Sequence, residues 1–362
     1  MFYHFSMKDC LLITANVGSI FEEPLIRKSW IKQIINTIFK EHAKFVAIHF
    51  QESGGKNYQK SSHEVPGLVQ HLCELLPEYD CCRAFLDLEF ANIETYTALS
   101  AVIFVHNSAV NDVKQYNFKQ RRFCDISKKP LIVENHLSKC EFVVKEKFPR
   151  SFWLEFRWGR KGFLHTRWSF EGKVIDLINI HLFHDESNLA IRENPALYSE
   201  NRRKAMNFTL TQYENFAAQH GVGCLFVFGD FNFRLNADSL LKKITENADP
   251  NEELEINSVE GDLDESVSDT SSHSIGVNGL LVENPDTGVS LRRHLSAIEF
   301  RVNDDETARD RSPSSCILRI EKKRFDYVDH DKFVTDWNMY REDDWEPALY
   351  PLQELDIKFP PT

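Results

Sequence analysis

The stretch Cys224-Leu-Phe-Val-Phe-Gly-Asp-Phe-Asn-Phe-Arg234 carries the clearest structural and chemical pattern in this sequence. Its first five residues are apolar, and a run of that length is typical of a buried β-strand. Gly229 permits a tight turn of the backbone directly after the strand. Two polar side chains, Asp230 and Asn232, come next. The stretch therefore predicts a strand of the protein interior that delivers polar groups at its end.

Other apolar runs have the same form and lie between segments with helical periodicity. Buried strands are predicted at residues 10–15, 45–50, 99–105, 174–180 and 224–228. Apolar residues spaced three or four apart predict helices around residues 30–38, 68–76 and 205–216. Because strands and helices interleave, the sequence predicts an α/β or α+β fold.

Polar residues follow several of these predicted strands, as they do in the opening stretch. Asn16 follows the first strand, Glu52 the second, and His181 the fourth. We expect such strand ends to gather around one crevice on a rigid scaffold. A glutamate suits Mg²⁺, which keeps several waters and uses one or two protein carboxylates.

The remaining polar strand ends suit phosphoryl chemistry. Asp230 is able to orient or deprotonate a water molecule, while His181 and Asn232 are able to donate hydrogen bonds to phosphoryl oxygens. Taken singly, each of these residues is as well explained by a cap, a turn or a solvated strand end. His181 and His184 have the spacing of a zinc pair, but no third ligand has suitable spacing. We therefore do not predict zinc.

The charge distribution separates an acidic segment from a nearly neutral body. The 362 residues carry a formal net charge of −12, and residues 246–272 contain acids but no lysine or arginine. An acidic balance argues against a nucleic-acid binder that works through bulk charge. No apolar run is long enough for a membrane helix, and the eight cysteines form no CxxC pair, which favours reduced cytoplasmic thiols.

The heptapeptide Phe228-Gly-Asp-Phe-Asn-Phe-Arg234 resembles the signature of inositol polyphosphate 5-phosphatases, within the endonuclease/exonuclease/phosphatase superfamily. Further segments in the same order resemble the type I branch of that family. They are Thr14–Ser19, Gln51–Tyr58, Glu146–Pro149, Arg160–Phe163, Asn179–Asp185, Glu321–Tyr327 and Leu355–Pro361. The resemblance covers residues 11–243 and 316–362 and leaves the acidic segment unmatched.

The resemblance implies a four-layer α/β sandwich and a division of the chain into three parts. Residues 8–244 are expected to form the N-terminal part of a phosphatase catalytic domain. Residues 245–315 are expected to be an acidic insert, disordered or weakly ordered, with short local structure at 275–282 and 291–300. Residues 316–362 are expected to continue the catalytic domain.

The implied activity is Mg²⁺-dependent hydrolysis of the 5-phosphate of inositol 1,4,5-trisphosphate and inositol 1,3,4,5-tetrakisphosphate. This reaction would terminate inositol phosphate and calcium signalling. The partner is then a small-molecule inositol phosphate, with no nucleic acid and no integral membrane segment. A cytoplasmic location is expected, with peripheral membrane association as an alternative.

The resemblance also implies roles for individual residues, carried over by position. Asn16 and Glu52 would hold Mg²⁺, and His181 would contact the scissile phosphate. Asp230 would position and activate the attacking water, and Asn232 would stabilise the transition state. The substrate-binding candidates are Lys161 and, on weaker grounds, His184, Arg192, Arg202, Arg203, Lys204 and Arg234.

The family pattern continues with two motifs that this sequence does not contain. They are a Pro-x-Trp-Cys-Asp-Arg segment, which grips substrate phosphate, and a Gly-Asp-His segment with a catalytic Asp–His pair. Their absence predicts a fold without its last strands. The first explanation is a fragment or an incomplete gene model of an active enzyme, and the second is a short isoform. It also leaves open a catalytically inactive module that binds inositol phosphates or a protein partner. A nuclease of the same superfamily is a third alternative, disfavoured by the acidic charge and the type I segments.

Overall fold

The computed structural model describes residues 9–134, 136–152, 159–185, 195–234, 237–245, 248–258, 281–283, 290–302, 316–321 and 324–328. The chain divides into two compact units. The first comprises residues 1–183 and 204–231, and the second comprises residues 184–203 and 232–362. In the described part of the chain, none of the helices combines the length and apolar character needed to cross a membrane.

The first sheet of the first unit has five strands in the order β1-β2-β4-β3-β7. Their bounds are β1 Cys10–Asn16, β2 Phe45–Gln51, β3 Cys81–Leu86, β4 Ser100–Val105 and β7 Leu131–Glu134. Strands β1 and β2 are parallel and are connected by helix α1 (Pro24–Glu41). The short helix α2 (Tyr58–Ser61) and helix α3 (Val65–Leu75) precede β3.

The second sheet has the strand order β11-β10-β9-β5-β6. Strand β8 also pairs with β9. The bounds are β5 Val113–Asn117, β6 Arg122–Asp125, β8 Val144–Lys147, β9 Gly162–Phe170, β10 Lys173–His181 and β11 Cys224–Asp230. Strands β10 and β11 are parallel, and helix α4 (Pro195–His220) lies between them in the sequence.

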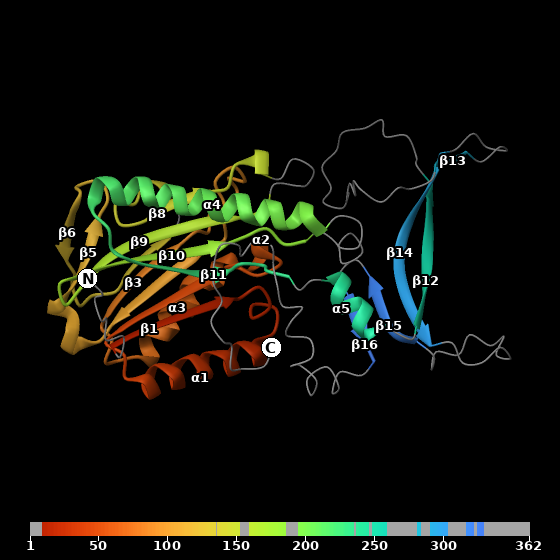
Figure 1. Cartoon of the computed structure of the whole chain (residues 1–362). Coiled ribbons are helices and arrows are strands. Elements are labelled where there is room, and N and C mark those ends of the chain that lie inside the picture. The colour runs from red at the N-terminus through yellow and green to blue at the C-terminus, as the bar shows by residue number, and fades with distance from the viewer. Residues whose placement is uncertain are drawn as a thin grey trace. The chain divides into compact units, whose positions relative to one another are not determined.

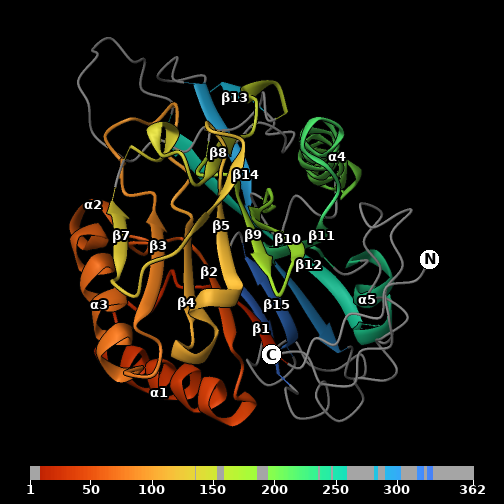
Figure 2. The same cartoon turned by 90° about the vertical axis from the view of Figure 1, so that its left-hand side faces the viewer.

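The two sheets pack face to face, and helices cover both outer faces (Figures 1 and 2). Strand β2 shows why, because its side chains alternate between two apolar cores. Val46 and Ile48 belong to the core beneath α1 and α3, whereas Phe45 and Ala47 belong to the core between the sheets. On the far side of the second sheet, Phe208 of α4 packs against Phe163 of β9 and against Phe148, which directly follows β8. The layers are therefore helix, sheet, sheet and helix.

The second unit has its own sheet in the order β12-β14-β15-β16, with β13 paired to β14. The bounds are β12 Ala248–Ser258, β13 Leu281–Glu283, β14 Ser290–Val302, β15 Cys316–Glu321 and β16 Arg324–Tyr327. Helix α5 (Ala237–Ile244) contributes Leu240 and Ile244 to a small core with residues of β14 and β15. This core explains why the apolar signal of the sequence returns after residue 316.

The strands predicted from apolar runs are confirmed as β1, β2, β4, β10 and β11, and the three predicted helices as parts of α1, α3 and α4. Within the expected insert at 245–315, the structure describes β12, β13 and β14, and β14 covers the segment 291–300. The motif segment at 355–361 and most of the segment 275–282 lie outside the described residues. The proposed domain boundaries stay a prediction.

His49 is a buried histidine at the end of the apolar gap between the two sheets. Its ring stacks on Phe228 of β11 with 3.8 Å between centroids and an interplanar angle of 10°. Nδ1 lies 3.3 Å from the Phe228 carbonyl oxygen, so Nδ1 carries the proton and donates. Nε2 is buried without a hydrogen-bond partner among the described residues. Burial lowers the pKa of His49 to about 3, with the Phe228 carbonyl opposing this shift.

We predict that His49 makes the protein acid-sensitive. Its folded-state pKa lies below the unfolded value of about 6.5. The unfolded state therefore binds the proton first, and stability falls as pH drops from about 6.5 towards about 3, by ~1.4 kcal/mol per pH unit. Denaturant unfolding across this range should show at least that slope, and His49→Phe should reduce the slope by ~1.4 kcal/mol per pH unit. The control Phe50→Leu should lower stability at every pH without changing the slope.

Candidate functional site

Two parallel strand pairs deliver side chains to the same end of the sandwich. In the first sheet Asn16 pairs with Gln51, so Asn16 and the following Glu52 come together at the carboxyl ends of β1 and β2. In the second sheet His181 pairs directly with Asp230 at the carboxyl ends of β10 and β11. One side-chain hydrogen bond joins the sheets here, because Asn16 Nδ2 donates to Asp230 Oδ2 over 2.9 Å.

Asp230 is held as a carboxylate at this junction. It accepts the Asn16 hydrogen bond, and His181 Nε2 lies 3.4 Å from Oδ2. Burial by itself raises the pKa of Asp230, but His181, Asn16 and the charge of Lys161 together hold it well below its usual value. A carboxylate of lowered pKa is a weak base and a reliable hydrogen-bond acceptor. The group is therefore better suited to orient a water molecule than to take its proton outright.

His181 is fully buried, and its pKa is lowered to about 4 by burial and by the charge of Lys161, against the opposing effect of Asp230. It is therefore neutral at pH 7. Lys161, which directly precedes β9, contacts His181 Nε2 through its Nζ. Nδ1 of the ring is buried and has no hydrogen-bond partner in the described part of the chain. The pair places one cationic group and one neutral ring beside the Asp230 carboxylate.

Glu52 occupies a backbone conformation that few residues other than glycine adopt, with φ of 55°. Its carboxylate lies against Gly18: a Cβ atom added at Gly18 would be 2.4 Å from Glu52 Oε2. Gly18 is thus needed for the space beside this carboxylate. Arg160 Nη2 lies 3.9 Å from the same oxygen, and its guanidinium carbon is 4.7 Å from the centroid of the Tyr58 ring.

The oxygen donors at the junction fit a magnesium ion. The described residues contain no group of three or more His, Cys, Asp or Glu side chains suited to a metal. The site instead combines two carboxylates, Glu52 and Asp230, with the amide oxygen of Asn16. Mg²⁺ uses one or two protein carboxylates and retains several waters, so this donor set is of the right kind.

The structure brings together five of the eight residues expected from the sequence: Asn16, Glu52, Lys161, His181 and Asp230. Asn232, His184 and Arg202 belong to the second unit, so they are not assigned to this cluster. Within that unit Arg202 is buried and pairs with Asp185 over 2.5 Å, and Arg234 Nε lies 3.4 Å from the same carboxylate. Their roles stay predictions, and Arg192 lies outside the described residues.

Sequence reasoning did not single out Gly18 or Arg160 as site residues. Both lie inside segments that resemble the phosphatase family, so a signal was present, but it did not distinguish them from their neighbours. Their importance comes from contacts with Glu52, which is distant in the sequence from Arg160. Such contacts depend on the packing of loops and are not encoded in strand periodicity.

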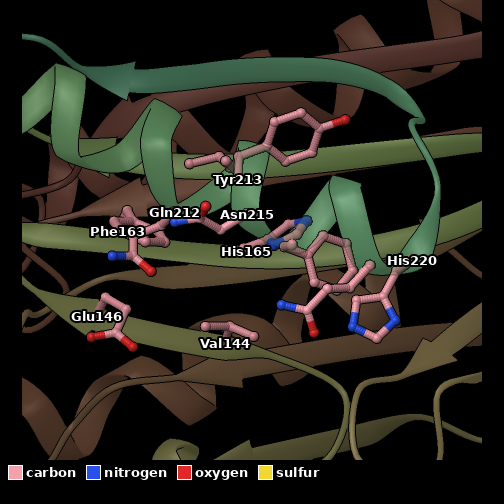
Figure 3. A pocket seen from close by; sticks show the side chains of 11 residues that line it. Val144, Glu146, Phe163, His165, Gln212, Tyr213, Asn215 and His220 are labelled. Atoms are coloured by element: carbon pink, nitrogen blue, oxygen red, sulfur yellow. The ribbon is translucent and has the colours of Figure 1, made fainter.

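A cavity of about 240 Å³ lies elsewhere, between the second sheet and α4 (Figure 3). Glu146 of β8, His165 of β9 and Tyr213 of α4 contribute to its lining, and so does Ile178 of β10. Because side chains alternate along a strand, Ile178 points to the face of β10 opposite to that of His181. The cavity is therefore separate from the cluster at the strand ends.

Comparison with known proteins identifies the family. A protein of Caenorhabditis elegans named "Probable type I inositol 1,4,5-trisphosphate 5-phosphatase" is 41% identical over 365 residues, which cover 98% of this chain and 85% of the relative. This chain belongs to the inositol polyphosphate 5-phosphatase family. "Inositol polyphosphate-5-phosphatase A" of Rattus norvegicus is 33% identical over 359 residues, covering 97% of this chain and 76% of that relative.

A family model agrees with membership of the 5-phosphatase family. The family described as "Endonuclease/Exonuclease/phosphatase family 2" matches residues 81–260. Membership confirms the expected α/β sandwich and the expectation of a phosphoric monoester hydrolase. Among solved structures, the inositol polyphosphate 5-phosphatase domain of SPsynaptojanin, crystallised with inositol (1,4)-bisphosphate and calcium, aligns at 15% identity and a TM-score of 0.28, covering 53% of this chain and 44% of that domain.

We predict that Gly18→Ala displaces the Glu52 carboxylate and lowers 5-phosphatase activity at least ~10-fold, the scale expected when a support of a metal ligand is lost. The new Cβ meets only the end of a flexible side chain and the Asn16 amide oxygen, so folding should be little affected. Steady-state kinetics and thermal unfolding would test this.

The matched control is Gly67→Ala in α3, where a Cβ meets no atom within 4 Å. This variant should retain full activity and gain up to ~1 kcal/mol of stability from helix propensity. Equal activities of the two alanine variants would contradict the role assigned to Gly18.

Proposed function

We propose that this protein hydrolyses the 5-phosphate of soluble inositol polyphosphates, inositol 1,4,5-trisphosphate and inositol 1,3,4,5-tetrakisphosphate, in a Mg²⁺-dependent reaction. The observation that carries the proposal is the meeting of Asn16, Glu52, His181 and Asp230 at the carboxyl ends of two parallel strand pairs. The name of the Caenorhabditis elegans relative supports inositol 1,4,5-trisphosphate as the first substrate to test. Through this reaction the protein would act in inositol phosphate and calcium signalling.

Glu52 and Asn16 are the residues that would hold Mg²⁺. When bound, the ion would supply positive charge to the phosphoryl oxygens and reduce their repulsion of an incoming nucleophile. Glu52 is the strongest candidate, because its carboxylate points into the space left by Gly18 and the Arg160 guanidinium stays 3.9 Å away from it. Asn16 would contribute a neutral oxygen while its Nδ2 keeps Asp230 in position.

Asp230 would orient the attacking water by accepting one of its protons in a hydrogen bond. The water oxygen then adds to phosphorus as the bond from phosphorus to the 5-oxygen of the inositol breaks, and one proton of the water passes by way of solvent to the departing 5-oxygen. The products are orthophosphate and the inositol phosphate with a free 5-hydroxyl, and no covalent enzyme intermediate is required. The hydrogen bond from Asn16 supports this role, because it fixes the direction of the Asp230 carboxylate.

Lys161 and His181 would balance the charge of the substrate. Lys161 brings a cation to the buried end of the site, and burial strengthens its attraction for a phosphate. His181 would contact a phosphoryl oxygen through its ring, and the position of Nε2 beside Lys161 Nζ and the Asp230 carboxylate supports that role. Asn232 would be a further donor to the transition state. His184 and Arg202 remain proposed substrate contacts.

We expect the purified 362-residue protein to release phosphate from inositol 1,4,5-trisphosphate with Mg²⁺ and to stop when EDTA removes the metal. Asp230→Asn should lower kcat by ~10²–10⁴-fold, because an aligned acceptor for the water is lost. Asp125→Asn is a matched control, since Asp125 is exposed and forms a surface ion pair with Lys114.

Two results would count against this function. Unchanged phosphate release by Asp230→Asn would remove Asp230 from the mechanism. A folded wild-type protein that binds inositol 1,4,5-trisphosphate but releases no phosphate would favour an inactive binding module instead. Circular dichroism of both proteins would establish that they are folded before the rates are compared.

A further inference from the structure

Asn179 is a fully buried amide between the two sheets, two residues before His181 at the end of β10. Residues two apart on a strand share a face, so Asn179 and His181 both face the first sheet. Leu177, on the same face, belongs to the apolar core between the sheets. The face of β10 thus changes from apolar to polar immediately before the site.

The side-chain hydrogen bonds of Asn179 cross from the second sheet to the first. Its Nδ2 donates to the Phe50 carbonyl of β2 at 3.0 Å and to the Ser100 carbonyl of β4 at 2.9 Å. Its Oδ1 accepts from Gln51 Nε2 at 2.7 Å. Burying an amide is unfavourable unless it is hydrogen-bonded, and the opposite sheet supplies the partners for both ends of this one. The side chain therefore fixes the register of one sheet against the other.

The same contacts restrain the backbone on both sides of Glu52. On the N-terminal side, the Gln51 side chain is held by Asn179 and also bonds to Thr14 of β1. On the C-terminal side, Ser53 N donates to the Ala98 carbonyl at 2.9 Å, and Ser53 Oγ lies 2.8 Å from Ser100 Oγ. Ser100 is itself a partner of Asn179.

A non-glycine residue with positive φ is unfavourable by ~1–3 kcal/mol and persists only where its surroundings determine its conformation. Glu52, with φ of 55°, is such a residue. Hydrogen bonds at Gln51 and Ser53 contribute to that determination. Asn179 bonds directly to Gln51 on one side and, on the other, to Ser100, whose hydroxyl lies beside that of Ser53.

We propose that Asn179 is a positioning residue of the phosphatase site, acting through Gln51 and the β4 strand on Glu52. It ties the metal-holding half of the site, Asn16 and Glu52 on the first sheet, to the half with His181 and Asp230 on the second. This inference rests on the proposed function, which identifies the cluster as a phosphatase site. It adds a separate claim, that Asn179 is needed for metal binding. Asn179 touches neither substrate nor metal in this account.

A purely structural role for Asn179 predicts a different outcome. Loss of buried hydrogen bonds would then lower stability without changing the site of the protein that remains folded. A positioning role predicts that the folded protein itself binds metal more weakly. Metal affinity of the folded state, measured apart from catalysis, therefore separates the two.

The experiment measures binding of Mn²⁺ alone to the full chain by electron paramagnetic resonance, and phosphate release from inositol 1,4,5-trisphosphate in parallel. Asn179→Leu keeps the side-chain size and removes every hydrogen bond. Gln51→Met removes one partner and tests the same link if the first variant does not fold. Tyr79→Phe is the control, because it deletes a buried hydrogen bond to the Ala43 carbonyl elsewhere in the first unit.

We expect Asn179→Leu to weaken Mn²⁺ binding ~10–100-fold, the range typical when a support of a metal ligand is removed. In the enzyme assay kcat should fall with it, while KM changes less than ~3-fold because the substrate contacts remain. Gln51→Met should show a smaller loss. The double variant should resemble Asn179→Leu alone, since both substitutions break one link. Tyr79→Phe should lower the melting temperature and leave Mn²⁺ binding unchanged.

Folded Asn179→Leu and Gln51→Met variants that bind Mn²⁺ as tightly as the wild type would overturn the proposal. An equal loss of Mn²⁺ binding in Tyr79→Phe would overturn it as well. A wild-type protein that binds Mn²⁺ in an Asn179-dependent way but releases no phosphate would refute the proposed function and support the positioning role. Phosphate release by the wild type that is retained in Asn179→Leu would support the proposed function and refute the positioning role.

Discussion

Hydrogen bonds across the gap between the two sheets are the constraint on which the site depends. Over most of its length this gap is filled by apolar side chains, and apolar contacts are non-directional. At one end, Asn179 and Asn16 form directed bonds from one sheet to the other. Apolar packing fixes how far apart the sheets lie, and these amides fix how they are aligned.

The alignment has an electrostatic consequence. Two carboxylates, Glu52 and Asp230, are brought to one place with Lys161 and Arg160 around them. Burial and the neighbouring lysine keep His181 uncharged, so the ring adds hydrogen-bonding capacity without adding charge. The result is a cluster of carboxylates and cationic side chains. The carboxylates are suited to a metal cation, and the cationic side chains are suited to a polyanion.

The sequence was sufficient to predict those parts of the structure that repeat locally. Apolar runs predicted β1, β2, β10 and β11, and the polar residues after them predicted the cluster, because parallel strands end at a common edge. Short strands such as β6 and β7 contain apolar runs of only two and three residues, which are too short to predict a strand. The cross-sheet role of Asn179, the fit of Gly18 against Glu52 and the stacking of His49 on Phe228 depend on tertiary register. Periodicity along one strand contains no information on that register.

At Glu52, the residue that suits the left-handed backbone differs from the residue that suits the proposed chemistry. Glycine would adopt this conformation without strain, yet it would remove the carboxylate that we propose as a metal ligand. On that proposal, activity requires a local strain that a more stable fold would lack. Gains in thermal stability would have to come from elsewhere, in the cores and on the outer helices, while the strained backbone at Glu52 is kept.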